Sequence, residues 1–106
     1  MKEIKNIVCY IKEELQDSKK YLDKTAEAKT QGLTEIYQTA YKLAQDELSH
    51  ALSWHDVAVN LINKKRQEMQ QKGEKVPQFM LDTWNDEHKY YIEETAKIKY
   101  MIELLR

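Results

Sequence analysis

Glycine and proline are scarce in this sequence of 106 residues, which contains two glycines and one proline. Strands joined by tight turns usually need more of these residues, and two glycines cannot build a glycine-rich phosphate-binding loop. Lysine, glutamate, glutamine, alanine and leucine, which are good helix formers, are abundant instead. The composition therefore predicts an all-α protein, and the length predicts a single helical domain covering residues 1–106.

Neither sign of charge dominates, because 17 Lys and Arg stand against 18 Asp and Glu. A surplus of positive charge drives binding to phosphate backbones, so we expect no nucleic acid partner. The single cysteine, Cys9, cannot form an internal disulfide, and the N-terminus has no apolar signal region. No apolar run reaches the ~20 residues of a transmembrane helix. These absences predict a cytoplasmic protein that does not enter the membrane.

Apolar residues recur with helical spacing in three segments, which predict helices at about 3–29, 34–72 and 77–105. Gly32 is expected to end the first helix and Thr34 to cap the second. A connection this short makes the first two helices an antiparallel hairpin. The direction of the third helix stays open. A tight turn near residue 72 would make it antiparallel to the second helix, whereas a linker that crosses the bundle would make it parallel.

Three polar residues interrupt the apolar faces of the first two helices: Glu14 on the first, and Glu47 and His50 on the second. A Glu and a His three residues apart project from one helix face about one turn apart, so both can reach one metal ion. In an antiparallel hairpin, two residues lie level when the midpoint of their numbers falls in the turn. Glu14 paired with Glu47 or with His50 has its midpoint within Thr30–Gly32. The three side chains are therefore expected to converge.

A buried carboxylate needs a partner, because burying it alone costs several kcal/mol. In one interpretation, Glu14, Glu47 and His50 bind a metal. In the other, they form a buried Glu/His hydrogen-bond network that fixes the register of a non-catalytic interaction or assembly protein without metal. The residues alone leave both interpretations open.

The third helix carries further polar residues whose position depends on its direction. In the antiparallel arrangement Glu94 lies level with His50, whereas in the parallel arrangement Glu87 and Tyr91 lie nearest Glu47. Glu87 and Glu94 are therefore two additional candidate metal ligands. Tyr91 is a candidate for a residue that positions the metal ligands without binding the metal itself.

His55 and His88 are the other two histidines, and the antiparallel arrangement places them level with one another. With Asp56 they could form a second site, or they could hold the metal ligands through hydrogen bonds. A single histidine among apolar neighbours is more often a satisfied boundary residue. We favour that interpretation for both.

Two stretches resemble the ferritin-like superfamily: Ile11-Lys12-Glu13-Glu14-Leu15, followed by Tyr21 seven residues after Glu14, and Gln45-Asp46-Glu47-Leu48-Ser49-His50-Ala51. In length and order they are most similar to the short encapsulated-ferritin type, over about residues 8–62. In that family a Glu on the first helix and a Glu-x-x-His on the second supply half of a di-iron site, and two chains complete it. This chain has no second Glu-x-x-His.

The resemblance implies that Glu14, Glu47 and His50 are ligands of a di-iron site, with manganese as an alternative metal, and that Tyr21 is a tyrosine near the site. It also implies a ferritin-like bundle completed by oligomerisation, and ferroxidase activity, in which dioxygen oxidises Fe(II). The expected partner is a second copy of the chain in a dimer or larger homo-oligomer. An encapsulating shell protein is a further partner that only the resemblance suggests.

Overall fold

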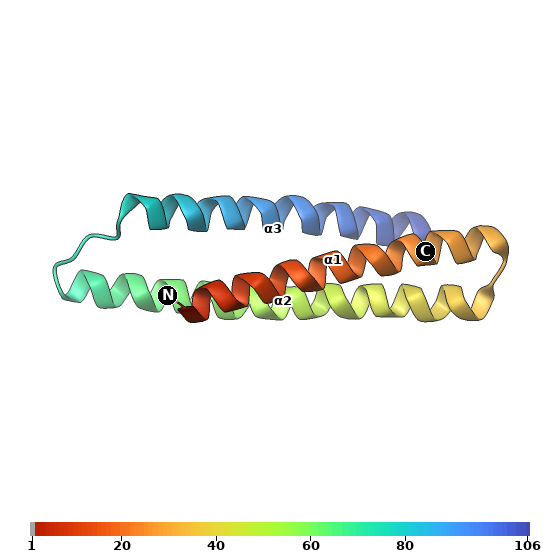
Figure 1. The fold of residues 1–106 in the computed structure, drawn as a ribbon, viewed down its shortest axis with the longest axis horizontal. Coiled ribbons are helices and arrows are strands. Elements are labelled where there is room, and N and C mark those ends of the chain that lie inside the picture. The colour runs from red at the N-terminus through yellow and green to blue at the C-terminus, as the bar shows by residue number, and fades with distance from the viewer. Residues whose placement is uncertain (1) are drawn as a thin grey trace.

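The computed structural model describes residues 2–106, which form three long helices lying side by side (Figure 1). Helix α1 spans Lys2–Gln31, α2 spans Thr34–Gln71 and α3 spans Gln78–Leu105. No strand occurs among residues 2–106, so the predicted all-α class is confirmed. The molecule is a rod of 61 × 18 × 17 Å. None of the helices within the described residues is both long and apolar enough to cross a lipid bilayer.

The turn between α1 and α2 begins at Gly32, whose φ of +71° lies in the left-handed region that glycine adopts without strain. The Leu33 N–H donates to the Ala28 carbonyl at 2.9 Å, the long bond of a Schellman motif. The prediction that Gly32 ends the first helix is confirmed. The prediction that Thr34 caps the second is wrong. Thr34 is the first helical residue, and Leu33 occupies the N-cap position without a side-chain cap hydrogen bond.

Contacts between α2 and α3 show that these helices are antiparallel. The Tyr41 hydroxyl donates to the Ile102 carbonyl at 2.7 Å, while His55, further along α2, lies beside His88, earlier on α3. Residue numbers thus fall on one helix as they rise on the other. The antiparallel alternative is confirmed, and the parallel crossing is wrong.

The main core lies where α1 packs on α2, and α3 covers part of it. Its buried members are Ile7, Ile11, Leu15, Leu22, Ala44, Leu48, Ala51, Ala58, Ile98 and Ile102. On α2 three of these positions, Ala44, Ala51 and Ala58, are seven residues apart and therefore share one helix face. Their small side chains let the backbone of α1 approach closely. A smaller cluster of Ile4, Met80 and Trp84 lies between α1 and α3.

We expect Ala51→Leu to lower the free energy of unfolding by about 1–3 kcal/mol, because added carbons in a packed contact force the helices apart. Ala51 is completely buried, whereas Ala96 on α3 is exposed. The matched control Ala96→Leu should change stability by less than about 0.5 kcal/mol. Urea unfolding followed by circular dichroism gives both values. Equal losses in the two variants would contradict the close helix contact.

Candidate metal centre

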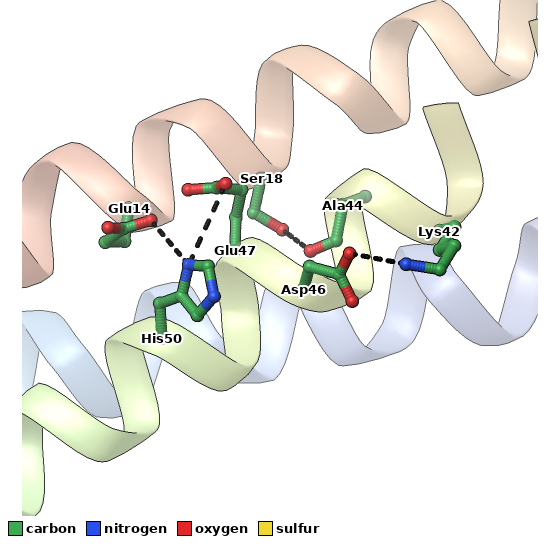
Figure 2. Close-up of polar contacts among 7 residues, drawn as sticks. All are labelled: Glu14, Ser18, Lys42, Ala44, Asp46, Glu47 and His50. Carbon is green, nitrogen blue, oxygen red and sulfur yellow. Dashed lines mark hydrogen bonds and ion pairs between the residues drawn. The ribbon is translucent and has the colours of Figure 1, made fainter. Parts of the chain in front are cut away.

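Glu14 of α1 meets Glu47 and His50 of α2 on one side of the helical hairpin (Figure 2). One ligand atom from each side chain lies within 4.8 Å of the other two. Within the described residues this is the one group of three His, Cys, Asp or Glu side chains close enough to share an ion. The convergence expected from the hairpin is thus present.

A hydrogen bond between the two helices holds them in register beside this group (Figure 2). The Ser18 hydroxyl, which is fully buried, donates to the Ala44 carbonyl at 2.8 Å. Ser18 lies one turn after Glu14, and Ala44 lies about one turn before Glu47. Ser18 was not singled out from the sequence. Its place on the apolar face of the first helix is the signal that could have found it, because a buried hydroxyl needs an acceptor.

The contacts from His50 to the two carboxylates are too long for ordinary hydrogen bonds. His50 Nδ1 lies 3.5 Å from Glu14 Oε2 and 3.9 Å from Glu47 Oε1, compared with about 2.7–3.2 Å for an N–H···O bond. Glu14 Oε2 is buried and accepts no hydrogen bond from any of residues 2–106. The carboxylates are largely covered, with 23% and 19% of the side chains exposed, whereas His50 is 56% exposed. The group is therefore open to solvent on its histidine side.

The two carboxyl groups strongly affect one another. The neighbouring Glu14 carboxyl, with which Glu47 can share a proton in a hydrogen bond, raises the pKa of Glu47 to about 7, and burial adds to the rise. The positive charge of a protonated His50 opposes it. Two ionised carboxylates this close repel each other unless a cation lies between them. The group therefore favours either a proton or a metal ion.

Glu87 and Glu94, the two candidate ligands on α3, do not join this group within the chain. Glu87 Oε2 lies 3.0 Å from Lys12 Nζ, and Glu94 Oε2 lies 2.9 Å from Lys19 Nζ. The hydrogen bond from Lys19 holds the pKa of Glu94 below its ordinary value. Each carboxylate thus already has a cation. The seven-residue spacing shared by the two lysines and the two glutamates is a sequence signal for this pairing between parallel helices.

The four supporting residues also lie outside the group. Tyr21 is half-buried two turns beyond Glu14, where it lines a groove near the α1–α2 turn. Tyr91 instead stacks on His55, with ring centroids 3.8 Å apart, and His88 lies beside that pair. His55, His88 and Tyr91 therefore form a separate cluster between α2 and α3. His55 is a half-buried boundary residue, whereas His88 is exposed.

Comparison of the chain with protein-family models, with curated proteins and with solved structures gives no match. The resemblance to the ferritin-like superfamily therefore depends on the spacing of Glu14, Tyr21, Glu47 and His50 and stays a prediction.

The raised pKa of Glu47 makes the stability of the metal-free protein pH-dependent. The folded state holds the proton to about pH 7, compared with an ordinary pKa of 4.5, so stability is lost as the pH rises between these values. Glutamine cannot ionise, so the variant does not lose this stability. The free energy of unfolding of Glu47→Gln, relative to that of wild type, should therefore rise by about 1–2 kcal/mol from about pH 5 to about pH 8. Urea unfolding in EDTA at both pH values measures this gain. Glu13→Gln, at an exposed position on α1, should follow wild type. A constant difference between wild type and Glu47→Gln at all pH values would contradict the carboxyl pair.

Proposed function

We propose that this chain is a ferritin-like di-iron carboxylate protein, which binds iron at a site shared between two chains. The observation that carries the proposal is the meeting of Glu14, Glu47 and His50 with their ligand atoms within 4.8 Å. Two carboxylates and one imidazole are the donor types of non-haem iron sites in helical bundles. The Glu-x-x-His pattern on α2 agrees with the same chemistry.

The residues fit a bound cation better than a closed hydrogen-bond network. A network without metal would need His50 to donate a good hydrogen bond to a carboxylate, but its distances of 3.5 and 3.9 Å are too long. Glu14 Oε2 is buried without a hydrogen bond. A divalent cation would satisfy this oxygen and would offset the charge repulsion between the ionised Glu14 and Glu47 carboxylates. The alternative function, a helical interaction protein without metal, therefore has less support.

In this proposal Glu14 and Glu47 hold the iron from two helices, and His50 adds an imidazole from the exposed side. The chemistry expected at the site is the oxidation of bound Fe(II) by dioxygen, which is ferroxidase chemistry. The chain's contribution is to fix the carboxylates through the packing of α1 on α2 and through the Ser18–Ala44 hydrogen bond. The exposed edge of His50 leaves the group accessible to an incoming ion.

The number of ligands is the reason for proposing two chains. One chain offers two carboxylates and one imidazole, whereas a carboxylate-bridged di-iron bundle uses about four and two. A second copy placed against the exposed side of His50 would supply the missing half. Ile36, Leu43 and Val57 share that face of α2, because each is separated from His50 by seven residues or a multiple of seven. Ile36 and Val57 are 43% and 40% exposed, so a partner would bury apolar surface there.

The protein should be at least a dimer, and Val57→Lys should weaken the association by placing a charge in the apolar face. Val59→Lys is the matched control, because Val59 has similar exposure but points to another side of α2. Light scattering at micromolar concentration measures the mass of each protein. A monomeric wild type would rule out the shared site, and equal effects of the two lysines would place the interface elsewhere.

Glu47→Gln should remove most of the iron, because it keeps the side-chain volume but loses the charge. Protein from iron-supplemented cells is analysed for metal, and absorbance is followed after Fe(II) is added in air. In wild type, Fe(II) or Mn(II) should stabilise the fold by about 3–4 kcal/mol at a hundred- to a thousandfold excess over Kd. Glu94→Gln is the matched control, because Glu94 is bound to Lys19, and it should retain the metal.

The alternative function predicts the opposite result for the same variants. Wild-type melting would then be independent of metal, and metal-free Glu47→Gln would be less stable than wild type because a buried pair with His50 has been broken. If Glu94→Gln lost the metal and Glu47→Gln kept it, a glutamate of α3 would be the metal ligand instead.

A further inference from the structure

Two histidines, side chains of a type that can ligate metals, lie together between α2 and α3, away from the carboxylate pair. His55 Nε2 and His88 Nδ1 face each other at 3.4 Å. The ring centroids are 5.4 Å apart and the planes differ by 23°, so the two rings approach each other through the edges that carry these nitrogens. This distance is long for a hydrogen bond between two imidazoles.

The same distance suits two imidazoles on one tetrahedral cation. Nitrogens bound to zinc at about 2.0–2.1 Å with a tetrahedral angle are separated by about 3.4 Å. Ions held by oxygen ligands, such as magnesium and calcium, would find no carboxylate between these two rings, and square-planar copper would need a shorter separation of about 2.8 Å. The distance between the nitrogens therefore suits a tetrahedral cation of intermediate softness, such as zinc.

The His55 ring is also held in place before any ion arrives. The His55 ring lies parallel to Tyr91, with the centroids 3.8 Å apart and the planes within 3°. Burial, with the neighbouring His88, lowers the pKa of His55, so this imidazole is neutral and able to bind metal at neutral pH. A ligand fixed by its neighbours loses less conformational freedom on binding.

The charges around the pair do not oppose a cation. Lys12 lines the same cavity of about 70 Å³, but its ammonium is bound to Glu87 at 3.0 Å. Asp56 follows His55 directly, and its negative charge acts on both His55 and Tyr91. The local balance is therefore slightly negative.

We propose that His55 and His88 form a zinc site that joins α2 to α3, with water completing the tetrahedron. This site is independent of the proposed iron site, because it shares none of Glu14, Glu47 or His50. Its effect would be to attach α3 more firmly to the α1–α2 hairpin, because a metal ligated from two helices stabilises the fold in which the ligands meet.

The test uses Glu47→Gln as the background, because this substitution removes one of the three ligands of the carboxylate group and so weakens zinc binding there. ZnCl₂ is titrated by calorimetry into metal-free Glu47→Gln and into Glu47→Gln/His88→Gln. The first should bind one zinc per chain and melt at a higher temperature with zinc, and the second should bind at least about tenfold more weakly. His88 is exposed, so glutamine there should not prevent folding, which melting curves in EDTA check. Glu47→Gln/His55→Gln provides a second disruption of the same site.

Equal zinc affinity with and without His88, or no zinc bound by Glu47→Gln, would overturn the proposal. The iron proposal is measured separately, because the single variant His88→Gln should keep its full iron content. Failure of iron binding in wild type would leave the zinc result unchanged.

Discussion

Alanines at positions 44, 51 and 58 let α1 lie close against α2, and the Ser18 hydroxyl bonds to the Ala44 carbonyl within this contact. Glu14 and Glu47 stand beside it, so the packing that stabilises the hairpin also brings two carboxylates together. A wider separation between the helices would relieve their repulsion but would open the core. The fold therefore fixes a pair of acids that favours a proton or a cation, and this pair is the basis of the proposed iron site.

The convergence of Glu14, Glu47 and His50 could be predicted because it depends only on the position of one short turn. A turn at Gly32 sets which residues lie level, and the apolar faces of both helices set which of these point inward. The same argument could not fix α3. Its connection to α2 is longer and polar, and two adjacent apolar rows on α3 leave its rotation undetermined. The contacts that orient α3 come instead from the Tyr41 hydroxyl of α2 and from Lys12 and Lys19 of α1.

The surroundings of Glu87 and Glu94 depend on the same rotation of α3. Each lies where α3 meets α1, within reach of a lysine of α1, with Glu87 half-buried and Glu94 buried. A glutamate at such a boundary is satisfied by the long, flexible side chain of lysine as readily as by a metal. The spacing of the two glutamates on α3 does not by itself separate these outcomes, although the matching spacing of Lys12 and Lys19 on α1 favours the ion pairs. The rotation of the helix about its own axis decides between them.

Helix α2 presents its two histidine sites on different sides. His50 and His55 are five residues apart, which on an α-helix is a rotation of about 140°. A second copy that covered His50, Leu43 and Val57 would therefore leave His55 facing α3 of its own chain. Dimerisation and zinc binding would then act on opposite sides of α2, the first completing the carboxylate group and the second holding α3. Substitutions at one site should thus leave the other intact, because little packed surface is shared between them.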